Sequence, residues 1–474
     1  MSSFSGLSTA LSSLIAQRQA LEVAGQNIAN ANTKGYTRQR VDMQSVQALA
    51  APSMFSAPLG AGNGVKVTGI TRVADIYLDA RLRASTATAS YTAGRADALA
   101  RLQTTVTEPA DTGFAATLQA FWASWQDVGN NPDDPAARKV LVGAADNAVK
   151  QVADGYRAVE TQWLQSRTEA DTLTTEVNTT AQSVAHLNTQ IRAILVSGGS
   201  ANELMDERDR LVTSLSGLVG AQARHREDGT VDVMVGGNAL VRGVTAHAVE
   251  VRGARLMGAA IATPGGPDSV RLAWAGTGTP LTLDGGRLSA TIETLAPEAD
   301  GGHLAHAAAR WDGIATALAT AVNTVHATAA RRDGTPGGAF FAVAPGQPAA
   351  LGLRVAVTAD QVAAATPGAG PNDGSMADAV AQLADADGGP DALWRDFVVD
   401  LGVRTRSAER RASVTEAARS TAENLQLASA SVDLDEETVT MLAYQRAYEG
   451  AARVMTAIDE MLDVLINRTG VVGR

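Results

Sequence analysis

The sequence predicts a mainly α-helical, elongated bundle or coiled coil that is built from both ends of the chain and carries an inserted β-rich outer domain. Apolar residues at alternating spacings of three and four recur near both termini and in the middle of the 474-residue chain. Between about residues 221 and 297 the pattern changes to short alternating segments separated by glycines. Aromatic residues make up only 4% of the chain, so its cores must rely on aliphatic side chains, which suit closely packed helices.

The N-terminal segment predicts a helix of about 25 residues with one narrow apolar stripe. Arg18 interrupts this stripe, and Gly25 extends it toward Ile28. The predicted coiled-coil seam on this helix consists of Leu7, Leu11, Leu14 and Leu21. A stripe this narrow requires a partner helix.

The C-terminal segment repeats the pattern more strictly. Its predicted seam consists of Met441, Tyr444, Tyr448, Met455, Ile458, Leu462 and Leu465. Residues 1–45 carry a net charge of +2 and residues 432–474 a net charge of −4, which favours pairing of the two ends, although exposed ion pairs contribute little. We therefore predict one terminal coiled-coil domain from 1–45 plus 432–474. Two amphipathic helices in unrelated domains remain the alternative on periodicity alone.

The middle of the chain predicts further helices and one β-rich insertion. Helical patterns cover 163–194, 203–219, 303–330 and 414–432, which predicts a discontinuous helical middle domain from 46–220 plus 298–431, with 331–390 rich in loops. Val231, Val233 and Val235 alternate with polar residues before a turn at Gly236. The stretches HAVEVRG, SVRLAW and PLTLDGGRLSATIE indicate further strands, so we predict an inserted β-rich outer domain at 221–297.

Composition excludes several classes of function. The net charge of −11 and a pI near 5.1 argue against a nucleic-acid partner. The sequence contains no run of 18 or more apolar residues, so we expect no membrane insertion. The chain has no cysteine, so disulfides and thiolate metal sites are excluded. The N-terminal residues lack the basic segment followed by an apolar segment that is typical of a cleavable signal peptide, so we expect none.

No catalytic, cofactor-binding or metal-binding pattern emerges. His303 and His306 share one face of a predicted helix, but without an H-E-x-x-H pattern we interpret them as a solvated face. The acidic residues of the segment DERDR, 206–210, alternate with arginines, which predicts a salt-bridged helix surface. A nucleophile elbow and a phosphate-binding loop are also absent from the sequence. We therefore expect no enzyme and no cofactor.

The stretch NIANANTKGYTRQR, residues 27–40, predicts the end of the first helix and the start of an extended segment. Gly35 is expected at a positive φ, where the chain reverses. Asparagine amides can satisfy free backbone groups at a helix end, and a tyrosine can anchor the extended segment. The candidate assembly residues are Asn27, Ile28, Asn30, Thr33, Gly35 and Tyr36. Acidic residues at 433–437 suit the start of the last helix, with Asp433 or Asp435 as its N-cap.

This stretch resembles the N-terminal signature of the flagellar axial proteins, which comprise rod, hook and hook-associated proteins. The segment SVDLDEETVTMLAYQRAYEGAARVMTAIDEMLDVLINR, 431–468, is similar to their C-terminal signature. Within the family, three segments resemble the hook-associated members that form the first hook–filament junction: NNPDDPAARKVLVGAADNAV at 130–149, NELMDERDRLVTSLSGLVG at 202–220 and ALATAVNTVHATAARRDGTPGGAFF at 317–341. Rod and hook proteins lack these middle segments.

The resemblance implies a structural component of the bacterial flagellum. Such a protein would be secreted by type III export and would form a helical homo-oligomeric layer outside the cell, with its terminal helices lining the central channel. Its expected partners are other copies of itself, the hook protein, the second hook–filament junction protein and an export chaperone. The alternatives are another axial protein (second junction, hook or rod protein, or flagellin), a cytosolic coiled-coil adaptor, and an enzyme carried on an axial scaffold.

Overall fold

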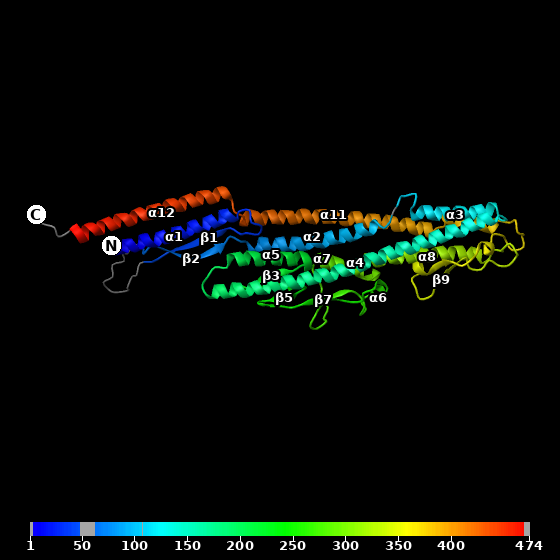
Figure 1. Ribbon diagram of the computed structural model, residues 1–474, viewed down its shortest axis with the longest axis horizontal. Helices are drawn as coiled ribbons and strands as arrows, with labels where there is room; N and C mark the ends of the chain where they lie inside the picture. Colours follow the sequence, from blue (N-terminus) through cyan, green and yellow to red (C-terminus); the bar gives the residue numbers. More distant parts are fainter. Residues whose placement is uncertain (1–2, 48–61, 107, 469–474) are drawn as a thin grey trace.

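The protein is a long rod in which the two chain ends lie together at one end. The computed structural model describes residues 3–47, 62–106 and 108–468. Helices of the two ends lie side by side beyond the rest of the molecule, and small β-sheets lie along one flank of the middle (Figure 1). The mainly helical class and the pairing of the two ends are thus confirmed. No helix in the described ranges is long and apolar enough to cross a membrane.

The protruding end, here called the terminal arm, contains two helices and one hairpin. Helices α1 (Ser3–Asn30) and α12 (Leu434–Asp463) pack along each other, and a short π-helical turn, η4 (Val464–Arg468), follows α12. Strands β1 (Gln39–Ser45) and β2 (Val65–Arg72) pair antiparallel and cover one side of α1. The arm's own core is small and consists of Ala20, Val23 and Val41, with Tyr444 packed against it.

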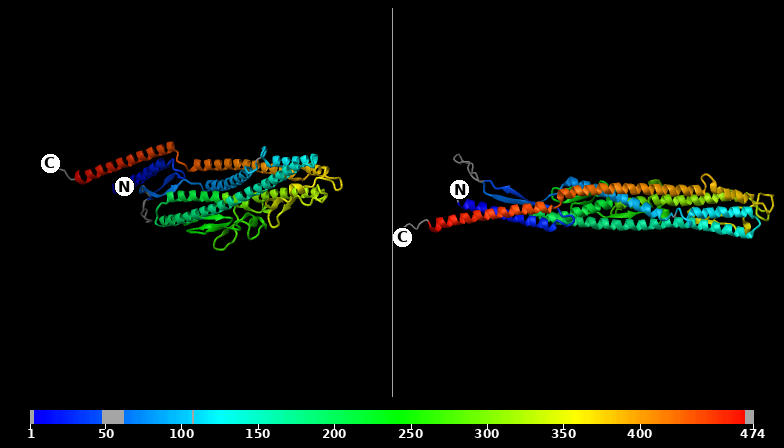
Figure 2. Two further views of the ribbon diagram at one scale, coloured as in Figure 1. Left: turned by 45° about the vertical axis from the view of Figure 1, so that its right-hand side comes forward. Right: turned by 90° about the horizontal axis from the view of Figure 1, so that it is seen from above.

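The rest of the molecule, here called the body, is a bundle of long helices. Its members are α2 (Ile76–Gln103), α3 (Phe114–Asn130), α4 (Pro135–Val196), α5 (Asn202–Val219), α7 (Arg287–Leu295), α8 (His303–His326) and α11 (Pro390–Ala430). Helix α11 runs along α2, and α4 extends along most of the body, as the two further views in Figure 2 also show. Asp134 caps α4 by accepting from the Ala136 amide, and Pro135 occupies its first turn.

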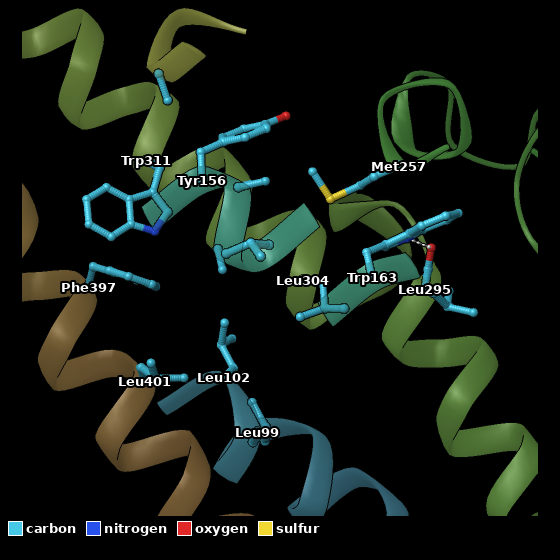
Figure 3. Close-up of a cluster of buried hydrophobic side chains, with 14 of the residues drawn as sticks. Leu99, Leu102, Tyr156, Trp163, Met257, Leu295, Leu304, Trp311, Phe397 and Leu401 are labelled. Carbon is cyan, nitrogen blue, oxygen red and sulfur yellow. Dashed lines mark hydrogen bonds between the residues drawn. The ribbon is translucent and has the colours of Figure 1, made fainter. Parts of the chain in front are cut away.

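The body has one continuous apolar core, and the few aromatic residues concentrate in it. Trp163 of α4 is fully buried and donates its indole N–H to the carbonyl of Leu295 at 3.3 Å (Figure 3). Trp311 of α8 packs against Trp394 of α11 with ring centroids 4.9 Å apart. Because these side chains come from separate helices, the core ties the helical bundle together independently of the arm.

A β-rich lobe lies along α4. Its four-stranded antiparallel sheet contains β3 (Gln222–His225), β4 (Val231–Val235), β5 (Asn238–Arg242) and β6 (Thr245–Ala246) in that order. Strands β7 (Val249–Arg252) and β8 (Arg271–Trp274) form a second hairpin, with the short helix α6 (Met257–Ile261) between them. The predicted strands at 231–235, 247–253 and 269–274 are thereby confirmed.

The strand interpretation of the segment 280–293 was wrong. Residues 287–295 form α7, whose Leu288 and Leu295 are fully buried in the body core. Its apolar residues suit a strand or a short buried helix equally, and packing against α2 and α4 selects the helix. The lobe's two ends meet, since a Cβ on Gly220 would lie 2.8 Å from the Gly285 nitrogen.

Two asparagines of α4 hold the lobe by its strand edges. The amide of Asn178 donates to the carbonyl of Val249 at 2.8 Å and accepts from the same residue's N–H at 2.9 Å. The amide of Asn188, fully buried, bonds Val231 in the same two ways and also donates to the carbonyl of Gly243. Each side chain thus replaces a neighbouring strand and satisfies backbone groups that would otherwise be buried unpaired.

The far end of the body contains the loop-rich segment expected at 331–390. Its regular pieces are β9 (Phe341–Val343), α9 (Ala349–Gly352), β10 (Leu353–Val355), α10 (Ser375–Ala381) and two 3-10 turns, η2 (Ala359–Gln361) and η3 (Gln382–Asp385). A third such turn, η1 (Glu298–Asp300), precedes α8. The segment closes the end of the bundle remote from the arm (Figure 1).

Candidate assembly site at the waist of the molecule

Asn27 is the centre of a polar network where the arm meets the body. Its side chain is fully buried and uses its whole hydrogen-bonding capacity. The amide nitrogen donates to the Gln39 carbonyl and to Glu437 Oε1, both at 2.8 Å. The amide oxygen accepts from the Tyr36 hydroxyl at 2.9 Å and from the Gln39 N–H at 3.0 Å. One side chain therefore joins α1, the first strand and α12.

The other residues of the N-terminal signature form the turn that delivers Gln39 to Asn27. Asn30 is in the last turn of α1, where its amide donates to the Gln26 carbonyl and accepts from the Thr33 hydroxyl. The Tyr36 N–H closes the turn on the Thr33 carbonyl at 3.1 Å. Gly35 has φ +84°, as expected, and Ile28 is half-buried on α1. The assembly role of these residues remains a prediction.

Glu437 is the counterpart of Asn27 on α12. It is almost fully buried, and its second oxygen lies 3.0 Å from Arg38 Nε in an ion pair. The N-cap of this helix is Asp433, which accepts from the amides of Asp435 and Glu436. Burial, together with the neighbouring carboxylates of Glu203, Asp206 and Glu437, raises the pKa of Tyr36 to about 12, so its hydroxyl stays a donor.

A second network links the arm to α5. Arg72, at the end of β2, lies 2.8 Å from Asp206 Oδ1 and 2.9 Å from Asp209 Oδ2. The Thr37 N–H donates to Asp206 Oδ2 at 3.0 Å, and Arg83 of α2 lies 3.5 Å from Asp209. These groups belong to the waist cluster, which comprises Arg72, Arg83, Asp206, Arg208 and Asp209.

The waist cluster corrects the sequence interpretation of the DERDR segment. Asp206 and Arg208 are buried, and only Glu207 and Arg210 form the expected exposed pair. Burial raises the pKa of Asp206. Burial acts in the same sense on Asp209, but Arg72, Arg208 and Arg83 outweigh it and hold the pKa of that carboxyl below its usual value. The partner that buries this face, Arg72, is 134 positions earlier in the chain, so local charge alternation could not reveal it.

The residues of the predicted α12 seam are buried to different degrees. Ile458 is buried, Met441, Tyr444, Met455 and Leu462 are half-buried, whereas Tyr448 and Leu465 are more exposed. A Cβ on Gly6 would lie 3.1 Å from Ile458, which places the two helices in close contact there.

The seam predicted on α1 is not the most buried face of that helix. Leu7, Leu14 and Leu21 are half-buried, and Leu11 is 47% exposed. The buried face of α1 consists instead of small residues: Ala10, Ala16, Ala20, Val23, Ala24 and Asn27. Small side chains let the hairpin and α12 approach this helix closely, and the leucine stripe is left partly uncovered.

The histidine pair is not a solvated face. His303 is buried where α2, α7 and α8 meet, and His306 bonds Glu298 at 2.8 Å and Asp400 at 3.2 Å. Burial and the nearby Arg95 lower the pKa of His303 to about 4. Across the described ranges, no group of three or more histidine, aspartate or glutamate side chains is placed to hold a metal ion.

Matches to known families cover both ends and the middle of the chain. Residues 7–37 match the family model described as flagella basal body rod protein, and residues 426–468 match the C-terminal model of the flagellar basal body rod FlgEFG proteins. These segments include most of α1, all of α12, and Asn27, Tyr36 and Glu437 of the polar network. A protein with paired terminal helices bearing both signatures belongs to the axial structural proteins of the flagellum.

The body narrows this class. Residues 99–341, about half of the chain, match the model described as flagellar hook-associated protein FlgK helical domain. Flagellar hook-associated protein 1 of Bacillus subtilis is 30% identical over the full length of both chains. The protein of the same name from Escherichia coli is 30% identical over 73% of this chain and 61% of its own length. The chain therefore belongs to the flagellar hook-associated protein 1 (FlgK) family.

A solved structure agrees with this assignment at the level of fold. The flagellar hook junction protein FlgK from Burkholderia pseudomallei superposes with a TM-score of 0.63 and 16% identity, covering 74% of this chain and all of that one. The family is structural and not enzymatic. The present chain is a hook–filament junction protein of the extracellular flagellum.

Proposed function

We propose that the chain forms the junction as a helical homo-oligomeric layer whose subunits contact one another through the terminal arms. The observation that carries the proposal is that both arm helices leave large apolar side chains uncovered. Leu11 and Ile15 of α1 are 47% and 59% exposed, and Val439, Val454 and Met461 of α12 are each more than half exposed. Large apolar side chains left exposed along both helices of one arm favour a role of the arm as a protein interface.

The uncovered faces suit a head-to-tail contact between copies. The face on α1 and the face on α12 are different surfaces of one arm, so a contact between them is heterologous and builds an open helical array instead of a closed dimer. The opposite net charges of residues 1–45 and 432–474 favour the same pairing between neighbours. The Asn27 network would then fix the arm geometry that each neighbour must match.

The layer's other partners follow from its place in the axis. We propose that the hook protein borders the layer on one side and the second hook–filament junction protein on the other. Before assembly, the chain would travel unfolded through the type III apparatus, and an export chaperone would cover the same apolar faces. The division into a terminal domain of 1–45 plus 432–474, a helical middle domain and an outer domain at 221–297 belongs to this proposal as well.

Charged substitutions on the uncovered faces test the proposal. We expect Ile15→Asp and Val454→Asp each to abolish self-assembly of the purified chain, as measured by sedimentation and electron microscopy, and to leave thermal unfolding of the body unchanged. Val414→Asp is the matched control, because Val414 is 69% exposed on the body helix α11. The proposal is refuted if both arm variants assemble like the parent, or if Val414→Asp abolishes assembly equally.

The neighbours in the axis require a separate measurement. Immunogold labelling of intact flagella should place the chain in one band between hook and filament. Hook–basal bodies capped by the purified chain should bind the second junction protein, and uncapped ones should not. Labelling spread along the filament would contradict the proposed position.

A further inference from the structure

The family signature does not explain why α5 carries a row of polar residues directed at the arm. Asn202, Glu203, Asp206 and Asp209 occupy one face of this helix, and each bonds a residue of the hairpin or its flank. The segment belongs to the middle region of the sequence, far from both termini. Together these four residues are here called the α5 socket.

We propose that the α5 socket is a positioning site that sets the angle between the terminal arm and the body, with Arg72 as the residue that it receives. The hairpin presents Gln39 and Arg72 to the socket as a directly paired couple at the end of the β1–β2 ladder. Arg72 enters between the two aspartates, with only 12% of its side chain exposed.

Gln39 completes the connection on the other strand. Its side-chain nitrogen donates to Glu203 Oε1 at 3.1 Å, and its side-chain oxygen accepts from the Asn202 amide at 3.0 Å. Asn202 also donates to the Ile70 carbonyl at 3.0 Å. The backbone of Gln39 is at the same time held by Asn27. The polar chain therefore runs without a break from α12 through α1 and the hairpin to α5.

The nature of these contacts makes the waist adjustable. The apolar cores of arm and body are separate clusters, and hydrogen bonds and ion pairs connect the hairpin and its flank to α5. Polar contacts can be exchanged with water without exposing an apolar core, so moving the arm costs far less than unfolding it. An open groove of about 700 Å³ lies beside the cluster and is lined in part by Lys34, Gly35 and Arg72.

The buried charges make Arg72 the decisive element. Without it, Asp209 keeps Arg83 and Arg208 as partners within the body, whereas Asp206 loses the one ion partner that it has among the described residues. Asp209, Arg83 and Arg208 of the waist cluster thus remain paired without Arg72, and what is lost is the ion-pair link between the hairpin and α5. This role of the α5 socket does not depend on which partner the arm contacts in the assembled layer.

The distance distribution between arm and body tests the proposal on the isolated full chain. Because the protein has no cysteine, Ala443→Cys on α12 and Ala417→Cys on α11, both exposed, give a unique spin-label pair. We expect one narrow distance peak in the parent and at least a twofold broadening, or a shifted peak, in Arg72→Met. Arg40→Met, which removes an exposed arginine from the same hairpin, should leave the peak unchanged.

Two further variants separate positioning from folding. Asp206→Asn should broaden the peak, and its combination with Arg72→Met should broaden it no more than Arg72→Met alone, because both changes break one link. Tryptophan fluorescence reports only the body, since all six tryptophans lie outside the arm. The midpoint of thermal unfolding measured by this fluorescence should be the same in Arg72→Met as in the parent. An Arg72→Met distribution equal to that of the parent, whether narrow or broad, overturns the proposal.

Discussion

Asn27 and Glu437 are 410 positions apart in the chain, and their side chains are joined by a buried hydrogen bond of 2.8 Å. Each also holds the start of the hairpin, Asn27 through the backbone of Gln39 and Glu437 through Arg38. The Asn27–Glu437 hydrogen bond and the Arg38–Glu437 ion pair therefore link the two ends of the protein at one buried point, beside an α1 face of small side chains.

Asn27→Asp should disrupt this register more than Asn27→Ala does. Alanine leaves the Gln39 backbone groups and Glu437 Oε1 without their Asn27 partner, which costs about 3 kcal/mol. Aspartate keeps an acceptor for the Gln39 N–H and the Tyr36 hydroxyl, but it replaces both amide donors by a second carboxylate at hydrogen-bond distance from Glu437, and the repulsion between the two carboxylates outweighs the acceptor that is kept. Hydrogen exchange of the β1 and β2 amides should therefore rise from parent to Ala to Asp. Equal protection in all three would contradict the assigned role.

Asn30→Ala is the control for that series. Asn30 is in the same signature, but its hydrogen bonds are to its own helix and turn at the surface. Water can replace them, so we expect a loss of less than about 1 kcal/mol and nearly unchanged protection of the hairpin.

Asn188→Ala should detach the lobe from α4. The substitution leaves the N–H and C=O of Val231 and the carbonyl of Gly243 without their buried partner, which we expect to lower the free energy of unfolding by about 3 kcal/mol. Thr189→Ala, one position further along α4 and exposed, should change it by less than about 0.5 kcal/mol. Chemical denaturation followed by circular dichroism provides the comparison. Equal effects of the two changes would refute the role of Asn188 in holding the lobe on α4.

Periodicity predicted the helices of the ends correctly and could not choose between two stripes on α1. Leucines at 7, 11, 14 and 21 and alanines at 10, 16, 20 and 24 both follow helical spacing. Hydrophobicity favours the leucines, whereas close approach of the hairpin and α12 selects the alanines. The leucines are left half-buried or, at Leu11, exposed, so helical spacing alone does not show which of two stripes is the buried one.

The waist shows a second limit of sequence reasoning. The signature stretch pointed to Asn27 and Gly35, but Gln39, Arg72 and Asn202 carried no motif that would separate them from solvated polar residues. Their roles depend on hairpin pairing and on packing against α5, which are long-range relationships. The acidic residues at 433–437 were the available signal, because acids with no basic residue near them in their own helix require a cation from elsewhere.

Acidification should destabilise the body through His303. Its pKa of about 4 in the folded protein is below the ordinary value of 6.5, so between these pH values the unfolded chain binds a proton that the folded chain does not. The His303 contribution to stability is therefore complete above pH 6.5 and falls as pH decreases toward 4, by about 3 kcal/mol in total.

The measurement is the difference in unfolding free energy between the parent and His303→Gln from pH 7.5 to 4. We expect the parent to lose more stability than the variant as pH falls through this window. His186→Gln, at an exposed position on α4, should follow the parent throughout. Parallel curves for the parent and His303→Gln would show that the buried imidazole does not titrate as described.

Gly35→Val should impair assembly without unfolding the body. Gly35 has φ +84°, and a β-branched residue in this region costs about 1–2 kcal/mol through the clash of its Cβ with the backbone. Space is not the obstacle, because the nearest atom to an added Cβ is Arg210 Cδ at 3.7 Å. The penalty therefore falls on the turn that brings Gln39 to Asn27.

Each subunit of a layer repeats this penalty, and every neighbour must accept the altered arm, so the effect on assembly should exceed the effect on the monomer. Gly25→Val is the matched control, since Gly25 is on α1 with open space around it and no positive φ. We expect the Gly35→Val strain to export a protein whose body folds normally after export, to lose motility and to release filament subunits into the medium, and we expect the Gly25→Val strain to be affected less. Normal filaments in the Gly35→Val strain would show that this turn tolerates another backbone geometry and that the Asn27 network does not depend on it.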